Sequence, residues 1–299
     1  MRWYVAILFA SIRLCGRLPL SWLHAAGAGL GRVLWWSQGK LRRHTEINLD
    51  LVMPLANATQ KRLTAERVLV ETGRSITEVA KVWGAGPKRA LTLVCEVENE
   101  ALFEAACRSG KGLIVAAPHL GCWELLNFWL CSRTPLAIVY RPPRHAAIEP
   151  LLIRARGALS PEQVRAEGAG IRTLYRRLQS GGVVGILPDQ LPKQGDGEFA
   201  PFFGVPALTM VLVSRLAQRT GATVLFAFAE RLPDGIGYRI RFHPAEPAVA
   251  DPDLPTAVAA LNRGIEACVN LAFDQYQWHY KRYRYRPSPD EPNPYRLHR

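Results

Sequence analysis

Apolar and polar residues alternate along the middle of the chain in two different periods. Short runs of consecutive apolar residues are separated by longer segments in which apolar residues recur every three or four positions. The short runs predict strands, of which GLIVAAP (112–118) is expected to be buried on both faces, and the longer segments predict helices. This alternation predicts an α/β fold in which a largely parallel or mixed central sheet is flanked by helices. The expected strands are LTLVCEVEN (91–99), GLIVAAP (112–118), PLAIVY (135–140), GGVVGILP (181–188) and ATVLFAFAE (222–230).

Three further segments add detail to this fold. Residues 59–81 have helical spacing of their apolar positions. Asn99 is expected to cap the helix that follows the first strand. GYRIRFHP (237–244) alternates apolar and polar residues, which is typical of a strand with one exposed face. We therefore expect this last strand at an edge of the sheet.

The first 40 residues are apolar but contain no segment long enough to span a bilayer. Residues 3–12 are uncharged, whereas a spanning helix needs about 20 apolar residues. Arg2, Arg13 and Arg17 fall within about 60° of each other on a helical wheel, as in a helix that lies in the membrane interface. Half of the eight tryptophans also lie within the first 36 residues, which suits headgroup depth. We expect residues 1–45 to form membrane-anchoring helices and residues 46–299 to form the remaining domain.

Two other interpretations of this region stay open. One is a buried pair of helices. The other is a cleaved signal peptide ending near the small residues Ala26-Gly27-Ala28, but Arg13 and Arg17 interrupt the apolar centre that such a peptide requires. GAGLG (27–31) follows no strand, so we interpret it as a site of close helix packing rather than a dinucleotide loop.

PHLGCWE (118–124) places a histidine and a glutamate where a buried strand gives way to a helix. Reactive groups in such sheets collect beyond the carboxyl ends of the strands. His119 stands in the turn, and Glu124 in the first helical turn could reach back to one ring nitrogen. A carboxylate there fixes the tautomer and stabilises the imidazolium. The pair predicts a general base, His119, oriented by Glu124.

The nucleophile that such a base would activate is not evident in the chain. No GxSxG segment is present, so the proton should come from a substrate hydroxyl. Cys122 is a neighbouring thiol and an alternative nucleophile, although no base is expected to face it. A structural alternative is that His119 and Glu124 only cap the helix.

Net charge and the spacing of the cysteines indicate which classes of partner and metal site to expect. The net charge of +13 and the pI near 9.8 indicate an anionic partner, which could be nucleic acid, acidic lipid or a phosphorylated substrate. Residues 1–45 contain seven Lys and Arg residues and no Asp or Glu. YKRYRYR (280–286) interleaves basic and aromatic residues, which suits either nucleic acid or anionic headgroups. The six cysteines form no CxxC pair, which argues against a zinc site.

Several blocks besides HLGCWE carry a resemblance to a known family. They occur in the family's order along nearly the whole chain, and the chain resembles the lipid A late acyltransferases, a branch of the glycerolipid acyltransferase superfamily with its H-x4-D/E signature. The further blocks are EINLDLVMP (46–54), VYRPP (139–143), LLIRARG (151–157), GGVVGILPDQ (181–190), PFFGVPALT (201–209) and WHYKRYRYRP (278–287).

The resemblance implies an activity and a set of partners. Enzymes of this family move an acyl chain from an acyl-carrier-protein thioester, less often from acyl-CoA, to a hydroxyl of a lipid A precursor in lipopolysaccharide biosynthesis. His119 would deprotonate that hydroxyl, Glu124 would hold the histidine, and neither metal nor cofactor would be needed beyond the acyl co-substrate. Residues 46–299 would be the acyltransferase domain. The expected location is the cytoplasmic face of the inner membrane, peripherally or through the N-terminal helices.

Other site residues follow from the same blocks. Arg156 would bind phosphate or the developing oxyanion, with Arg154 as a competing candidate. Asp189 and Gln190 follow a strand, so they could bind sugar hydroxyls or brace the His119 turn. PFFG suggests that the acyl channel is lined by Phe202 and Phe203, although a core role is an equal alternative.

The expected partners are acyl carrier protein, a lipid A precursor and anionic inner-membrane lipid, with no nucleic acid. Two alternative functions remain open. A basic nucleic-acid-binding protein would not depend on His119. An acyltransferase acting on a lysophospholipid or another glycolipid, such as a mannolipid, would share His119 and Glu124 but differ in its acceptor. The PDQ and PFFG blocks favour lipid A.

Overall fold

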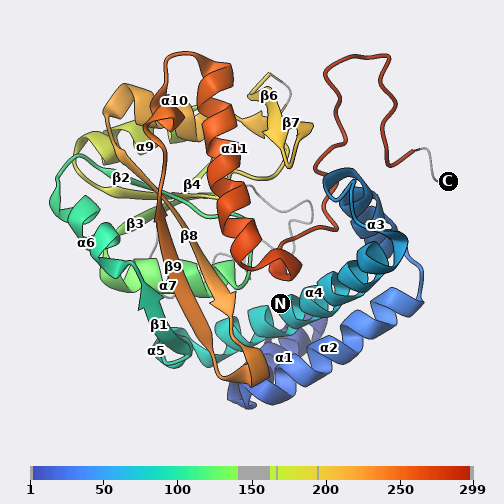
Figure 1. Ribbon diagram of the computed structural model, residues 1–299. Coiled ribbons are helices and arrows are strands. Elements are labelled where there is room, and N and C mark those ends of the chain that lie inside the picture. The colour runs from blue at the N-terminus through green and yellow to red at the C-terminus, as the bar shows by residue number, and fades with distance from the viewer. Residues whose placement is uncertain (1–2, 141–161, 166–167, 194, 297–299) are drawn as a thin grey trace.

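The centre of the molecule is a seven-stranded sheet with helices on both faces (Figure 1). The computed structural model describes residues 3–140, 162–165, 168–193 and 195–296, and their side chains from residue 10 onward. Neighbouring strands in the sheet run parallel except for β8 and β9, which are antiparallel. The prediction of an α/β fold with a mixed, mostly parallel sheet is confirmed. In spatial order the strands are β1 (Val94–Glu98), β9 (Tyr238–Pro244), β8 (Thr223–Arg231), β2 (Leu113–Ala116), β5 (Val183–Ile186), β3 (Leu136–Tyr140) and β4 (Glu162–Arg165).

Two hydrophobic cores lie on opposite faces of this sheet. One joins the sheet to α9 (Ala169–Gln179), α10 (Leu212–Thr220) and α11 (Leu254–Leu271). The other joins it to α5 (Pro87–Leu91), α6 (Glu100–Arg108) and α7 (Trp123–Arg133). Both central strands β2 and β5 are buried at every residue, which confirms the prediction made for β2. The remaining short elements are the hairpin β6 (Gly197–Phe202) and β7 (Val205–Met210), and the 3-10 turns η2 (Pro233–Gly235), η3 (Pro247–Ala250) and η4 (Phe273–Gln275).

Two sequence predictions were wrong, one about the position of β9 and one about the cap of α6. β9 is not at an edge of the sheet, because it lies between β1 and β8. Its alternating pattern arises because one face packs into the core while Arg239 and Arg241 on the other face pair with glutamates of β1 and β8. Asn99 precedes α6 in a left-handed conformation, and its side chain does not cap the helix. Its amide donates instead to the carbonyl oxygen of Phe242, which ties the helix start to β9.

The chain before α5 forms the helices α1 (Trp3–Arg17), α2 (Leu20–Trp36), α3 (Lys40–Val52) and α4 (Ala58–Ala85). α1 and α2 lie along α4 (Figure 1), and glycines bring the backbones together. A Cβ on Gly31 would lie 2.4 Å from the carbonyl oxygen of Leu69, and one on Gly73 would lie 2.1 Å from that of Gly27. The interpretation of GAGLG as close helix packing is therefore confirmed. α3 continues across residue 45, and the proposed boundary between an anchor and a second domain stays a prediction.

The outer face of α1 and α2 is apolar and exposed. Trp36 is 77% exposed, Trp22 67%, Val33 61% and Leu14 59%, and Leu30 also lies at the surface. The opposite face of α2 is buried and includes Leu23, His24 and Trp35, and His24 lies 3.6 Å from Glu78 of α4. Among the helices of the described residues, none combines the length and the hydropathy that a membrane-spanning helix requires.

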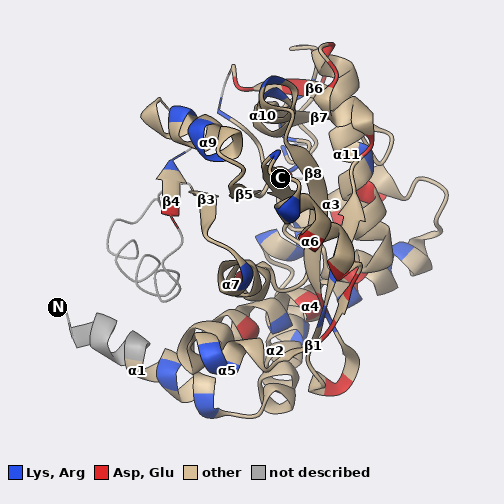
Figure 2. Cartoon of the chain, turned by 90° about the vertical axis from the view of Figure 1, so that its left-hand side faces the viewer, with Lys and Arg blue, Asp and Glu red and all other residues tan. Residues whose placement is uncertain are grey.

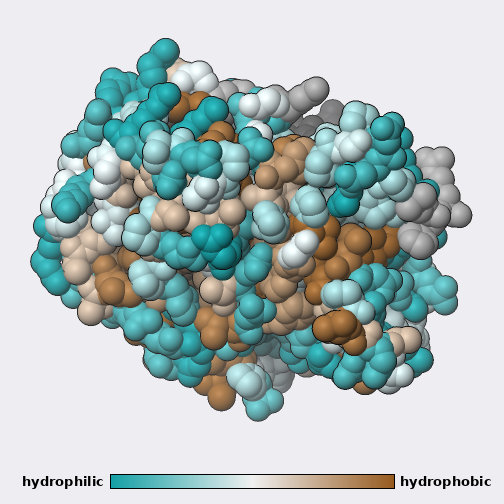
Figure 3. Space-filling view, turned by 45° about the horizontal axis from the view of Figure 1, so that its top comes forward, coloured by the Kyte–Doolittle hydropathy of each residue, from teal (hydrophilic) through white to brown (hydrophobic). Residues whose placement is uncertain are grey.

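The C-terminal segment packs against the body of the protein. Within YKRYRYR, Arg282 and Tyr283 are buried. Arg282 donates to the carbonyl oxygen of Leu208 and to the hydroxyl of Thr209, and the Tyr283 hydroxyl donates to the carbonyl oxygen of Phe202. Arg282 and Tyr283 are therefore not available to the anionic headgroups that the composition of this segment suits. Hydrophilic residues predominate on the surface that Figure 3 shows, with apolar residues gathered in patches between them.

Candidate active site

The turn between β2 and α7 carries His119 and is fixed on both sides by the backbone. On one side, the Cys122 N–H donates to the carbonyl oxygen of Ala229 at the end of β8, over 2.9 Å. Gly121 adopts φ of +59°, and a Cβ there would lie 2.0 Å from the same oxygen. The turn therefore needs a glycine at position 121 to lie this close to β8.

On its other side, the turn pairs with the C-terminal segment. The backbone N–H of Gln277 donates to the carbonyl oxygen of His119, over 3.1 Å, and the N–H of Gly121 donates to that of Gln275, over 3.3 Å. The Gln275 side chain in turn bonds both backbone groups of Arg231. Residues separated by some 150 positions thus hold the His119 backbone in place.

Asp189 binds His119 twice. Its Oδ2 accepts from the His119 backbone N–H at 2.9 Å, and its Oδ1 lies 2.8 Å from Nδ1 of the ring. The pairing follows from the sheet, because Ala116 of β2 lies opposite Ile186 of β5 and each residue of the pair stands three positions beyond its strand. Asp189 is only 2% exposed.

The charge of Asp189 determines which nitrogen of the His119 ring carries the proton. Burial would raise the pKa of this carboxyl, but the charge and the two hydrogen bonds of His119, with the charge of Arg282, hold it below its ordinary value. An ionised carboxylate only accepts hydrogen bonds, so we assign the ring proton to Nδ1. Nε2 then carries the lone pair, and it makes no hydrogen bond with any residue that the structure describes.

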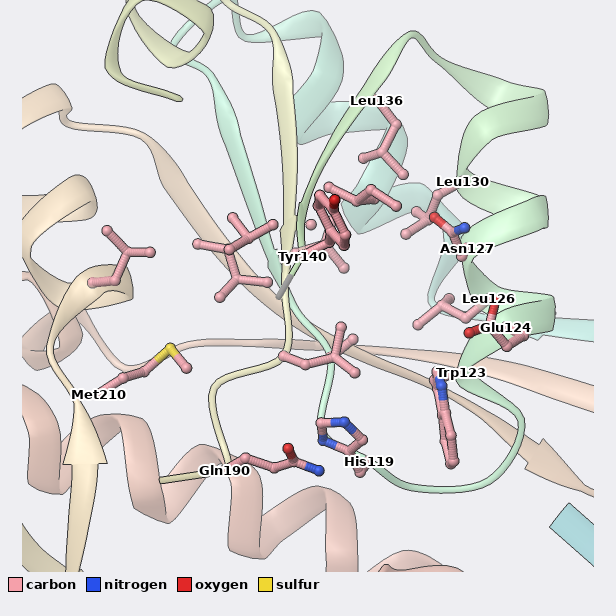
Figure 4. A pocket seen from close by; sticks show the side chains of 18 of the residues that line it. His119, Trp123, Glu124, Leu126, Asn127, Leu130, Leu136, Tyr140, Gln190 and Met210 are labelled. Carbon is pink, nitrogen blue, oxygen red and sulfur yellow. The ribbon is translucent and has the colours of Figure 1, made fainter. Parts of the chain in front are cut away.

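The hydrogen bond that we expected from Glu124 to the His119 ring is made at Nδ1 by Asp189 instead. Glu124 does stand in the first turn of α7, where it is 3% exposed. Its Oε2 accepts a hydrogen bond of 3.2 Å from the indole nitrogen of Trp83 on α4. His119 and Glu124 both border the same cavity (Figure 4), and a catalytic role for Glu124 stays a prediction.

This cavity has a volume of about 290 Å³ and lies between α7 and the strands β2, β3 and β5, with its His119 end at the carboxyl end of β2. Figure 4 shows His119 and Gln190 at one end of it and Leu130 and Leu136 at the other. Trp123 and Asn127 stand along the α7 side. The lining is mainly aliphatic, so the space suits a hydrocarbon chain whose polar end lies beside His119. Apolar lining residues include Val115, Leu126, Ile138, Ile186, Leu187, Leu191, Met210 and Leu212.

The other predicted site residues divide into three groups. Gln190 lines the cavity, and its amide donates to the side-chain oxygen of Gln277 over 3.0 Å. Phe202 and Phe203 pack in the core around Trp278 and Tyr283, which matches the core role considered for them, and neither is among the described residues that line the cavity. Arg154 and Arg156 lie outside the described residues.

Cys122 is poorly suited to act as a nucleophile. It is 2% exposed at the start of α7. Burial, followed by the nearby charge of Glu78, raises the pKa of its thiol well above the ordinary value. The sulfur is therefore protonated at neutral pH, whereas the thiolate is the reactive form.

A buried charge network, not evident from the sequence, lies behind the turn. The Arg231 guanidinium at the end of β8 pairs with Glu78 and Glu71 of α4, and Glu78 also accepts from the Tyr238 hydroxyl, over 2.8 Å. Burial would raise the pKa of Glu78, but the charge of Arg231 and hydrogen bonds from His24, Arg231 and Tyr238 lower it to about 2. The network fixes α4 to the strand end on which the His119 turn rests.

Residues 1–285 match the family described as bacterial lipid A biosynthesis acyltransferase. The chain belongs to this family. Its resemblance to the late acyltransferases is thereby confirmed, and the protein is an acyltransferase whose family acts in lipid A biosynthesis.

Three relatives show how far the similarity extends. A lipid A biosynthesis lauroyltransferase of Escherichia coli (strain K12) is 24% identical over 273 residues, which cover 91% of this chain and 88% of the relative. A lipid A biosynthesis palmitoleoyltransferase of the same organism is 26% identical over 241 residues, covering 80% and 78%. A phosphatidylinositol mannoside acyltransferase of Mycobacterium tuberculosis (strain ATCC 25618 / H37Rv) is 26% identical over 184 residues, covering 59% and 55%.

Proposed function

We propose that this enzyme transfers a fatty acyl chain from an acyl-carrier-protein thioester to a hydroxyl of a lipid A precursor, with His119 as the general base. One observation carries the proposal. His119 is held through Nδ1 by a buried carboxylate, and the same side chain borders an apolar cavity at the carboxyl end of the sheet. The family membership supports acyl transfer in lipid A biosynthesis as the setting.

The chemistry follows from the tautomer. Nε2 of His119 takes the proton of the acceptor hydroxyl as its oxygen attacks the thioester carbonyl, and Asp189 stabilises the imidazolium that forms. The tetrahedral intermediate collapses by breaking the C–S bond. A thiol has an ordinary pKa of about 8.5, so the thiolate leaves readily and recovers the proton from the imidazolium. The reaction needs neither an acyl-enzyme nor a cofactor.

The two acids then have different tasks. Asp189 sets the tautomer and orientation of His119 through two hydrogen bonds. Glu124, held by Trp83 at the wall of the cavity, would help to position the substrate beside His119. Gln190, at the His119 end of the cavity, would contact the polar part of the acceptor.

The cavity would take the acyl chain. Its volume of about 290 Å³ is at the lower end of the range of small-molecule sites, about 300–1,000 Å³. Aliphatic side chains line it beyond His119, so the thioester carbonyl would lie beside Nε2 when the chain is inserted.

The acceptor is a lipid, and we propose that the outer face of α1 and α2 lies on the cytoplasmic face of the inner membrane. Exposed Trp22 and Trp36 suit the depth of the headgroups. Arg13, Arg17 and Arg32 are exposed on the same two helices and would contact anionic lipid.

Mass spectrometry of lipid A tests the proposed function. Cells that lack the gene should lose one secondary acyl chain. Wild type should restore the chain and His119→Ala should not, provided that both proteins accumulate equally. Similarity to the phosphatidylinositol mannoside acyltransferase makes another glycolipid the second candidate acceptor. If the lipid A profile is unchanged but a phospholipid or another glycolipid loses an acyl chain, the acceptor assignment is wrong while the base chemistry stands.

A further inference from the structure

Four exposed arginines gather around one tyrosine on the surface of α9 and α10. Tyr175 of α9 donates its hydroxyl to the carbonyl oxygen of Arg215 on α10, over 3.3 Å, which joins the two helices. The Arg219 guanidinium lies 5.9 Å from the centre of the Tyr175 ring. Neither helix contains an Asp or a Glu. We call Arg172, Arg176, Arg215 and Arg219 the arginine patch; all four are exposed.

The positive charge of the patch is not neutralised within the described residues. None of its four arginines pairs with a carboxylate there, whereas Arg177 of α9 lies 3.5 Å from Glu162. On other surfaces Arg133 pairs with Glu100, and Arg263 with Glu246. Four arginines on two adjacent helices, none paired with a carboxylate in the described part of the chain, create a local field that attracts an acidic partner.

The patch begins close to a wall of the cavity. Leu212, the first residue of α10, lines the cavity, and Arg215 follows it by about one helical turn. A shallow hollow bordered by Arg172, Tyr175 and Arg176 lies on the α9 side of the patch. A partner bound here could direct an extended arm past Leu212 toward His119.

The position of the patch argues for a soluble partner rather than a lipid surface. α9 and α10 lie at the opposite end of the molecule from α1 and α2, as both Figure 1 and Figure 2 show. The basic bands on α9 are visible in Figure 2. If the apolar face of α1 and α2 rests on the bilayer, the patch faces away from it.

We infer that the arginine patch is the docking surface for the acidic protein that carries the acyl thioester. The inference rests on the proposed function, and it adds where the donor binds. Docking through unpaired surface charges implies fast association and strong salt dependence.

The test compares two donors. Arg176→Glu/Arg215→Glu is assayed with acyl carrier protein and with acyl-pantetheine, which presents the same thioester without a protein or phosphates. We expect kcat/KM with the carrier protein to fall by about tenfold or more through KM, and the rate with acyl-pantetheine to stay unchanged. Arg263→Glu, which reverses a paired arginine elsewhere on the surface, is the matched control and should alter neither rate.

Direct binding separates this inference from the proposed function. Fluorescence anisotropy with labelled acyl carrier protein should show weaker binding for the double variant and a steep salt dependence for wild type. Three results would each overturn the docking surface while leaving the proposed function intact. The double variant could match wild type with both donors, or it could lose the same factor in rate with both. It could also lose binding to anionic vesicles while still binding carrier protein. If wild type transfers acyl chains from neither donor, the proposed function itself fails and the docking surface with it.

Discussion

Asp189→Asn changes the atom that holds the His119 ring with little change in size. The carboxylate now accepts from both the backbone N–H and Nδ1 of His119. An amide has a single acceptor oxygen, so its NH2 group must face one of these two positions. If it faces Nδ1, the ring proton moves to Nε2 and the base is lost. If it faces the backbone N–H, the turn loses a hydrogen bond.

The size of the effect follows from the lost interaction. A hydrogen bond to a charged group contributes about 1.5–3 kcal/mol, which corresponds to roughly a 10- to 150-fold lower kcat. The assay measures thiol release and acylated lipid from purified protein with an acyl-carrier-protein donor. The reasoning is refuted if Asp189→Asn keeps kcat within about threefold of wild type while Glu124→Gln loses it.

A matched control separates catalysis from folding. Glu266 is a half-buried carboxylate that accepts a 2.7 Å hydrogen bond from the backbone N–H of Phe203, away from the cavity. Glu266→Gln also replaces a carboxylate by an amide, but its side-chain oxygen can still accept from the Phe203 N–H, so this variant should leave kcat unchanged.

Three further predictions concern the packing that supports the site. Gly121→Ala should destabilise the fold by more than about 2 kcal/mol and abolish activity, because its Cβ meets the carbonyl oxygen of Ala229. Gly110 has φ of +68° with open space around it, so Gly110→Ala should lower the free energy of unfolding in urea by about 1–2 kcal/mol and keep activity. Equal losses in Gly121→Ala and Gly110→Ala would contradict this prediction. Gly31→Ala should lower Tm because its Cβ meets the Leu69 carbonyl oxygen, whereas Gly29→Ala on the same helix meets nothing and should raise Tm slightly; the reverse order would be inconsistent with the packing. Glu78→Gln should cost about 3 kcal/mol at pH 7. Since the pKa of Glu78 is lowered from 4.5 to about 2 in the folded protein, this difference is fully present above pH 4.5 and shrinks as the pH falls toward 2. Urea unfolding at pH 7 and pH 3 checks it, and a difference that grows at low pH would contradict the assignment.

The sequence predicted what depends on local pattern and missed what depends on which strands are neighbours. The apolar run of β2 placed His119 at a strand end, and the structure agrees. Glu124 is the carboxylate nearest to His119 along the chain, so the local pattern favours it as the partner. Asp189 takes Nδ1 because β2 and β5 are adjacent and in register, which the order of the strands along the chain does not reveal.

The same limit explains the other corrections. Polarity alternates along β9 because only one of its faces packs into the core. An interior strand can have this pattern when its other face carries ion pairs, as β9 does. Arg282 and Tyr283 belong to a basic and aromatic run that looks identical whether it covers a surface or fills a core. Their burial depends on acceptors supplied by Leu208, Thr209 and Phe202, far away in the sequence.

The central claim is that Nε2 of His119 removes the proton from the acceptor hydroxyl. Single-turnover transfer from a bound acyl thioester to the lipid acceptor measures this step directly, with His119→Gln against wild type and with acceptor binding measured in parallel. The account predicts a rate that is lower by about 10²- to 10⁴-fold with acceptor affinity retained. A His119→Gln enzyme within about tenfold of wild type, or a comparable loss in Cys122→Ser together with a trapped acyl-enzyme, would contradict it.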